Sequence, residues 1–278
     1  HLKAIKRVVF ILSLFLLSTV FGQEIAVLSY NIRYNSSGDG LDLWELRKTE
    51  LINQIKELNP MSFGVQESTL TQMKDLEAGL PDYDYVGVGR DDGSTKGEFS
   101  AIFYKRGELK VLQEDTFWLS ETPEKVSIGW DAALPRICTY AKFELTSSKK
   151  RFWHFNTHFD HMGEIARVES AKLIISKIAD LVSSGDALVL NGDFNAEPHE
   201  EPILVLNHSF EDPADRVKLQ GPVGTFSGFQ LDAPLDRRID YIFTKNMEVK
   251  TYQHLDTKRA NGRWISDHLP VLLSFNLN

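Results

Sequence analysis

The segment from Leu188 to Pro198 contains the residues whose types and spacing most clearly suggest chemistry. Its apolar beginning ends in Asn191-Gly192, and Asp193 and Asn195 follow directly. Open α/β sheets bind their ligands at the carboxyl ends of strands, where these two side chains would stand. A spacing of two places both on one side of an extended backbone, where the carboxylate orients a water molecule and the carboxamide holds an oxygen. The alternative is an Asx-rich turn after a core strand, which requires no chemistry.

Polar side chains also follow or interrupt five other apolar runs. They are Asn31, Glu67, the segment Asn156-Thr157-His158, Asp240 and the segment Ser266-Asp267-His268. A buried carboxylate is costly unless it is paired or bound to a cation. Any one of these residues alone is better explained by structural hydrogen bonding, but six such junctions in one domain indicate a shared site.

These residue types suit the attack of water on a phosphoryl group. Hard oxygen ligands such as Glu67, Asn31 and Asp267 suit Mg²⁺ or Mn²⁺, which keep several waters and bind substrate phosphate directly. We expect His268 and Asp240 to pair, so that the carboxylate fixes the tautomer of the imidazole and raises its pKa. Such a histidine acts on the phosphate or on the water.

Three other kinds of chemistry lack support in the sequence. The chain has no closely spaced Cys and His residues, which disfavours a structural zinc site. It has no Gly-x-Ser-x-Gly segment, which disfavours a serine hydrolase. It also lacks the glycine-rich loops that bind nucleoside triphosphates or dinucleotides.

The elements that must position these residues are predicted from hydrophobic periodicity. Strands are expected over residues 25–30, 62–65, 99–104, 137–145, 151–157, 187–190, 239–244 and 271–275. Helices are expected over residues 51–58 after an Asp42 cap, 70–79 after a Ser68 cap, and 168–182 before Gly185. Few helices among many short strands predict mixed sheets covered by helices, rather than a strict βαβ alternation.

Residues 1–22 have the pattern of a secretory signal peptide. A basic start with Lys3, Lys6 and Arg7 precedes a run from Val8 to Phe21 that is nearly all apolar, and cleavage is expected after Gly22. An uncleaved membrane anchor is the second interpretation, because the run is shorter than the roughly 20 residues of a spanning helix. We therefore expect a secreted or periplasmic protein whose catalytic domain covers residues 23–278.

The composition is that of a globular protein with a large core. Hydrophobic residues make up 42% and charged residues 25%, and Cys138 is the only cysteine. No intrachain disulfide can form, so packing must supply the stability of an exported protein. The formal net charge of −8 becomes −11 when the three basic residues of the leader are removed.

Six segments in order resemble the motifs of the endonuclease/exonuclease/phosphatase superfamily. They are Leu28–Arg33, Gly64–Glu67, Asn156–His158, Asn191–Asn195, Arg238–Phe243 and Ser266–Val271. The resemblance covers almost the whole mature chain. It implies an α/β (α+β) four-layer sandwich, with two mixed β-sheets packed face to face and helices on both outer faces.

The resemblance also implies a role for each matching residue. Glu67 would be the principal metal ligand, with Asn31 beside it and Asp267 near the metal. Asp193 would orient or deprotonate the attacking water, and Asn195 would hold the nucleophile or a phosphate oxygen. His158 and His268 would contact the scissile phosphate. Glu98 would be the acidic partner of His158, and Asp240 would be that of His268.

Further segments resemble a secreted bacterial branch of this superfamily. They are Trp44 with Arg47-Lys48, Gly129–Ala132 with Arg136, His161 after Asp160, and Gly224–Phe226. Arg136 is a candidate phosphate clamp, because a guanidinium binds two phosphate oxygens at once, and a surface ion pair is the alternative. Trp130, like Phe226, is expected to line the substrate cleft or to pack in the core.

We therefore expect a monomeric, Mg²⁺- or Mn²⁺-dependent phosphoesterase without stable membrane insertion after signal cleavage. A secreted nuclease is the alternative, and an inactive binding module is disfavoured because Glu67, Asp193 and His268 are all present. Tight binding of nucleic acid needs several Lys and Arg residues on one surface, whereas this chain is acidic and Lys149-Lys150-Arg151 is its only basic run of three. A compact small-molecule or lipid-linked phosphate ester is thus favoured, with nucleic acid still possible.

Overall fold

The computed structural model describes residues 23–277. The predicted signal peptide, residues 1–22, lies outside this range. Within residues 23–277, no helix is both long and apolar enough to cross a lipid bilayer.

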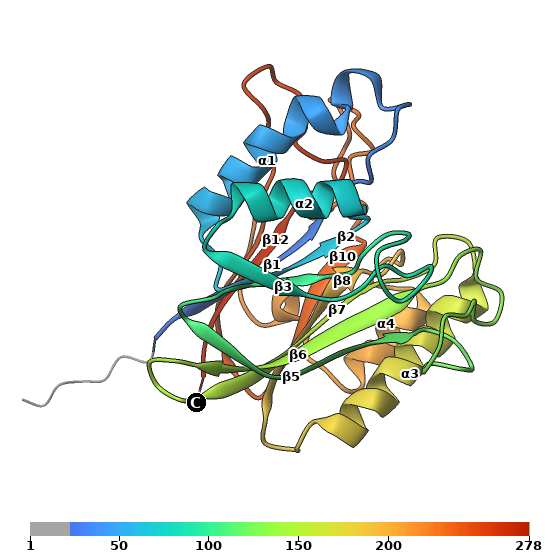
Figure 1. The fold of residues 1–278 in the computed structure, drawn as a ribbon, viewed down its shortest axis with the longest axis vertical. Coiled ribbons are helices and arrows are strands. Elements are labelled where there is room, and N and C mark those ends of the chain that lie inside the picture. Colours follow the sequence, from blue (N-terminus) through green and yellow to red (C-terminus); the bar gives the residue numbers. More distant parts are fainter. Residues whose placement is uncertain (1–22, 278) are drawn as a thin grey trace, which may run out of the picture.

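Two mixed β-sheets form the centre of the fold (Figure 1). The seven-stranded sheet contains, in spatial order, β3 (Tyr83–Val86), β4 (Ile102–Lys105), β2 (Ser62–Gln66), β1 (Ile25–Asn31), β12 (Val271–Asn276), β11 (Glu248–His254) and β9 (Leu219–Gln220). The five-stranded sheet contains β10 (Asp240–Lys245), β8 (Ala187–Asp193), β7 (Arg151–His158), β6 (Ile137–Leu145) and β5 (Leu109–Trp118).

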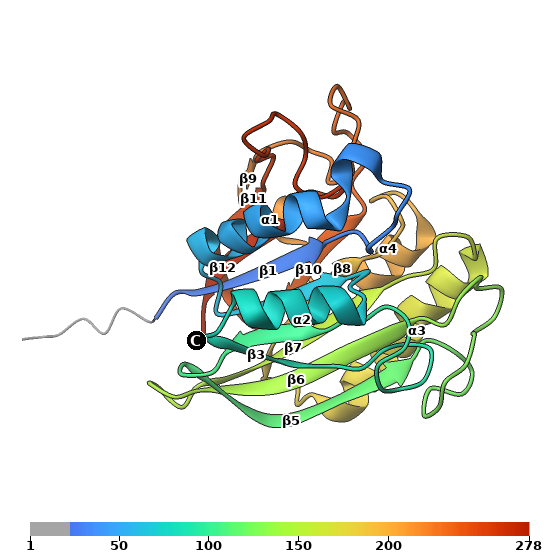
Figure 2. The ribbon, with the colours of Figure 1, turned by 45° about the horizontal axis from the view of Figure 1, so that its top comes forward.

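Helices cover the outer face of each sheet (Figure 2). Helices α1 (Trp44–Leu58) and α2 (Leu70–Gly79) pack on the seven-stranded sheet, and α3 (Glu164–Leu181) and α4 (Glu201–Asn207) pack on the five-stranded sheet. Two short 3₁₀ helices, η1 (Gly40–Asp42) and η2 (Pro213–Asp215), lie in the connections. The predicted four-layer sandwich is therefore confirmed.

The alternation of strand side chains divides the core into layers. On β1, Val27 points into the core between the sheets, whereas Leu28 packs beneath α1 and α2. On β8, Val189 points into the same inter-sheet core, whereas Leu190 packs beneath α3 and α4. Both faces of these strands are therefore buried, which explains why they appear in the sequence as continuous apolar runs.

A set of buried polar residues interrupts the apolar core between the sheets. We call it the polar layer, and it consists of Ser29, Ser62, Gln66, His154, Asn156 and Asn191. His154 Nε2 lies 2.6 Å from Asn191 Oδ1, and the Asn191 amide donates to Ser29 Oγ at 2.8 Å. The Gln66 amide donates to Asn156 Oδ1 at 2.6 Å. Hydrogen bonds therefore join β1 and β2 of one sheet to β7 and β8 of the other.

Strands at or near sheet edges were missed by the sequence prediction. Strand β5 exposes much of its middle, and β3 and β11 alternate with exposed or half-buried positions, so none of them forms a continuous apolar run. The predicted strand over residues 99–104 begins only at Ile102, and the strand predicted to end at Leu190 continues through Asp193.

Two predicted helix caps are also wrong. Asp42 does not cap α1, which starts after Leu43. Asp42 instead forms buried ion pairs with Arg259 and Arg263. Helix α2 is capped by Thr69 rather than Ser68, in a capping box with Gln72. The third helix starts at Glu164, before the predicted residue 168.

Candidate active site

Strand register brings the polar residues of the five-stranded sheet to one place. His158 at the end of β7 and Asp240 at the start of β10 both lie directly opposite Asp193 at the end of β8. In the other sheet, Asn31 ends β1 opposite Gln66, so Glu67 follows beside it. The Asn31 amide crosses between the sheets and donates to Asp193 Oδ2 at 2.9 Å and to Glu67 Oε1 at 3.1 Å.

Asp193 is the centre of the site and is almost completely buried. Its Oδ2 atom lies 3.4 Å from His158 Nε2 and 3.7 Å from His268 Nε2. Burial raises the pKa of Asp193, and Asp240 adds to this effect while the His268 charge opposes it. The carboxylate thus stands where it can accept a proton from a bound water.

Both interpretations of the segment around Asn195, the Asx turn and the side chain that reaches the site, apply to this residue. Its backbone N–H donates to Asp193 Oδ1 at 3.0 Å, which is the Asx turn, and its φ of 47° is left-handed rather than extended. The backbone is therefore not extended at Asn195. The side chain nevertheless reaches the site, because Asn195 Nδ2 lies 3.1 Å from His158 Nε2.

His268 and Asp240 are paired in the structure. His268 Nδ1 lies 2.9 Å from Asp240 Oδ2, and the Thr225 hydroxyl donates to the same oxygen at 2.6 Å. Burial lowers the pKa of His268, but Asp240 and Asp193 outweigh burial and raise this pKa well above its ordinary value. The two carboxylates therefore favour the protonated form of the His268 ring.

The pKa of His158 is shifted in the opposite direction. Burial, with the charges of Arg136 and Arg90, lowers its pKa well below the ordinary value and so favours the neutral ring. Glu98 lies 4.0 Å from His158 Nδ1 and is held instead by two hydrogen bonds from Arg90, at 2.7 and 3.0 Å. Arg90 was not recognised in the sequence, because a single arginine in a loop carries no motif of its own.

Oxygen ligands for a divalent cation gather around Glu67. Donor atoms of Glu67, His158 and Asp193 all lie within 4.8 Å of one another. Asp267 is not in this compact group, and the Arg33 guanidinium lies 3.9 Å from both Asp267 and Glu67. Burial raises the pKa of Asp267 to about 6, and the Glu67 charge adds to the effect while His268 opposes it. Such crowded carboxylates fit a hard cation, which would relieve their repulsion.

A cavity of about 500 Å³ opens above these groups. Arg136 and His161 line it, and so do three residues that were not predicted as site residues, Arg33, Tyr34 and Arg237. Arg136 is not in a surface ion pair, because its pair with Asp160 at 3.1 Å is buried.

The two predicted aromatic residues lie in different places. Phe226 lines the cavity and packs edge-on against His268, with 4.9 Å between the ring centroids. Trp130 does not line the cavity, and its backbone N–H donates to Glu121 in the same loop. The prediction that Trp130 lies in the substrate site therefore gains no support from the structure.

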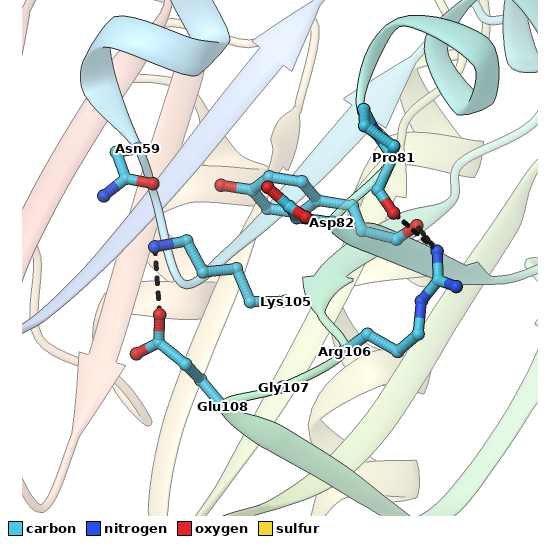
Figure 3. Close-up of a pocket in the computed structure, with 8 residues that line it drawn as sticks. Asn59, Pro81, Asp82, Lys105, Arg106, Gly107 and Glu108 are labelled. Carbon is cyan, nitrogen blue, oxygen red and sulfur yellow. Dashed lines mark hydrogen bonds and ion pairs between the residues drawn. The ribbon is translucent and has the colours of Figure 1, made fainter.

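A second cavity, of about 470 Å³, lies near the opposite end of β2 from Glu67 (Figure 3). Its cations already have partners, because Lys105 pairs with Glu108 at 3.1 Å and Arg106 donates to the Pro81 carbonyl at 2.8 Å. It contains no histidine. The chemistry is therefore assigned to the first cavity.

Arg47 holds the loops that carry the metal-side residues. Its buried guanidinium donates to the backbone carbonyls of Ile32, Arg33, Asp42 and Ile265. The Ser266 hydroxyl adds a bond of 2.7 Å to the Asn31 carbonyl. These bonds fix the segment after Asn31 against the segment before Asp267.

The chain belongs to the Endonuclease/Exonuclease/phosphatase family, whose sequence pattern matches residues 28–268 of this chain. This confirms the family resemblance seen in the sequence.

Individual relatives agree with this assignment. An uncharacterized protein, L388, of Acanthamoeba polyphaga mimivirus is 30% identical over 249 residues, covering 84% of this chain and 92% of its own. A family member from Bacteroides thetaiotaomicron has a TM-score of 0.88 at 37% identity, covering 92% of this chain and 99% of that chain. A mannosyl-6-phosphatase from the same organism has a TM-score of 0.86 at 37% identity, covering 90% and 99%.

The pairing of Asp240 with His268 yields a prediction for the metal-free protein. Asp240→Asn removes the main charge that keeps His268 protonated, so the pKa of His268 should fall and the ring should lose its proton at lower pH. An NMR titration of the His268 ring in the wild type and the variant measures this. Asp180→Asn, on the exposed face of α3, should leave the titration unchanged. An unchanged His268 curve in Asp240→Asn would contradict the assignment.

Proposed function

We propose that this protein is a divalent-metal-dependent phosphoesterase that hydrolyses a compact phosphate ester by attack of water. One observation carries the proposal. Asp193, which can accept a proton, lies within 3.7 Å of both His158 and His268 and is joined through Asn31 to Glu67. This combination provides a base, charge stabilisation and a cation site around one point.

The side chains divide the work of the reaction. Asp193 Oδ2 orients the attacking water and takes its proton. Asn195 Nδ2 holds the water or a phosphate oxygen, and His268 Nε2 stabilises the charge that develops on the phosphate oxygens. Glu67 and Asn31 would hold the cation, with Asp267 nearby. When bound, Mg²⁺ or Mn²⁺ supplies Lewis-acid stabilisation of phosphate charge.

The placement of basic residues supports a compact substrate over a long nucleic acid. Lys149-Lys150-Arg151 lies at the start of β7, the opposite end of that strand from His158. Near the cavity, Arg238 is buried in a pair with Asp212, and Arg259 is buried in a pair with Asp42. Arg238 and Arg259 are therefore unavailable for the phosphates of a nucleic-acid backbone, while Arg237 lines the cavity and is exposed. With few basic residues placed there, the nuclease is the second candidate.

The relative named as a mannosyl-6-phosphatase also supports a small phosphate ester, since 37% identity extends over nearly the whole of that chain. A lipid-linked ester remains within the same proposal.

We also propose that the protein is exported, on the pattern of residues 1–22. Intact mass of exported protein beginning at or near Gln23 would support export, and retention of residues 1–22 would reject it.

The proposed reaction is tested with a substrate panel and Mg²⁺. Phosphorylated sugars, a small phosphodiester, phospholipid vesicles and supercoiled plasmid separate the candidate substrates. EDTA should abolish activity, and Mg²⁺ or Mn²⁺ should restore it. Asp193→Asn should lower turnover by about 10²- to 10⁴-fold, while the variant remains folded, because removal of a buried charge offsets the loss of one accepted hydrogen bond.

Asp180→Asn is the matched control and should retain activity. Full activity after exhaustive chelation would refute the metal-dependent mechanism. Rapid plasmid nicking at physiological salt, lost in Asp193→Asn, would make the nuclease the correct function.

A further inference from the structure

Arg136 is a cavity cation whose hydrogen-bonding capacity is only partly used. Its Nε donates to Asp160 Oδ2 at 3.1 Å, and its Nη2 lies 2.9 Å from His161 Nδ1. Its Nη1 is buried and has no hydrogen-bond partner within residues 23–277. A buried donor without an acceptor is costly, so this atom is suited to an acceptor that arrives with the substrate.

The guanidinium is rigidly held in this position. Asp160 Oδ1 accepts N–H bonds from Ala133, Met162 and Gly163, at distances from 2.8 to 3.1 Å. These donors outweigh burial and lower the pKa of Asp160 to about 2, so its charge persists. A fixed carboxylate therefore orients one edge of Arg136 and leaves Nη1 for a ligand.

Two other arginines near the cavity are held by carboxylates, whereas the exposed Arg237, which lines the cavity, lies 3.9 Å from Glu197. Arg90 binds both oxygens of Glu98, and Arg33 binds both oxygens of Asp39. The arginine of the second cavity, Arg106, bonds to backbone carbonyls (Figure 3). Arg136 differs from Arg90, Arg33 and Arg106 because its single carboxylate partner occupies only Nε.

Arg136 also stands close to the place where the scissile phosphate must lie. Arg136 and His158 both line the cavity that contains Asp193 and Asn195. His158 in turn contacts Asp193 and Asn195. The cavity thus offers three groups of partners for phosphate oxygens, which are the cation site at Glu67, the Asn195 and His268 pair, and Arg136.

Counting oxygens separates the two classes of phosphate ester. A phosphomonoester has three terminal oxygens and carries up to two negative charges, whereas an internal phosphodiester has two terminal oxygens and one charge. In a diester, the third position is an ester oxygen that carries a substituent and makes a poor acceptor for a guanidinium. A third, cationic partner is therefore useful only for a monoester.

Resting on the proposed phosphoesterase function, we propose that Arg136, held by Asp160 and flanked by His161, selects phosphomonoesters by binding the third terminal oxygen. Arg136 is then a specificity-determining residue for the reaction. Its loss should affect hydrolysis of a monoester far more than hydrolysis of a diester.

The test compares p-nitrophenyl phosphate with bis(p-nitrophenyl) phosphate as substrates in the presence of Mg²⁺. The wild type should have the higher kcat/KM for the monoester. Arg136→Met should lower kcat/KM for the monoester by about 10- to 100-fold, as expected for a charged hydrogen bond, and change that for the diester by less than about threefold. Arg106→Met is the control and should change neither value.

Removing Arg136 leaves Asp160 buried without its partner, which lowers stability. The double variant Arg136→Met/Asp160→Asn removes both charges and should show the same selective loss. Calorimetric titration with inorganic phosphate and dimethyl phosphate tests the clamp without turnover. The wild type should bind phosphate more tightly, and both variants should lose that preference.

Equal losses on both esters, a wild-type preference for the diester, or unchanged phosphate binding in the variants would overturn the assignment of Arg136. If the wild type hydrolysed neither the monoester nor the diester, the proposed function would be refuted, and the calorimetric result would then decide the clamp by itself.

Discussion

The close approach of the two sheets at the polar layer is the constraint on which the site depends. A side chain at Gly64 would place its Cβ 2.4 Å from Asn191 Nδ2 and 2.5 Å from Asn156 Cγ, so only glycine lets the sheets meet there. Ser29, Asn156 and Asn191 stand two positions before Asn31, His158 and Asp193. Because alternate residues of a strand share a face, each of these residues of the polar layer lies on the same face as the reactive residue that follows it. Hydrogen bonds in the polar layer therefore set the relative heights of the reactive side chains on both sheets.

Charge balance is the second feature that makes this arrangement suitable for chemistry. The carboxylates of Glu67, Asp193 and Asp267 line the cavity, and that of Asp240 lies on the strand beside Asp193. Burial raises the pKa of Asp193 and of Asp267. His268 lies within ion-pair distance of two of these carboxylates, Asp193 at 3.7 Å and Asp240 at 2.9 Å. On the Glu67 side, the Arg33 guanidinium lies 3.9 Å from both Glu67 and Asp267. A divalent cation bound there would add further positive charge among the carboxylates.

Much of the fold and site was predictable because buried strands and their polar ends are visible locally. Strands β1, β7 and β8 read as apolar runs, and Asn31, His158 and Asp193 stand at their ends. Strands β5 and β11 were missed because exposed positions hide their pattern. Arg90, Arg33 and Arg47 were missed as site residues because their partners are distant in sequence or are backbone carbonyls. The cap of α2 is Thr69 and not Ser68. The choice between two neighbouring hydroxyl residues depends on backbone geometry, which the sequence alone does not give.

We propose that residues of both sheets form one cation site, at which a bound cation relieves the repulsion between the carboxylates. Thermal unfolding of the wild type and of Glu67→Gln, each with EDTA and with excess Mg²⁺, tests it most directly. The account predicts that Mg²⁺ raises the Tm of the wild type, because a ligand that binds only the folded state stabilises it, and that Glu67→Gln loses this increase. A wild-type Tm that does not respond to Mg²⁺, or an equal response in Glu67→Gln, would contradict the account.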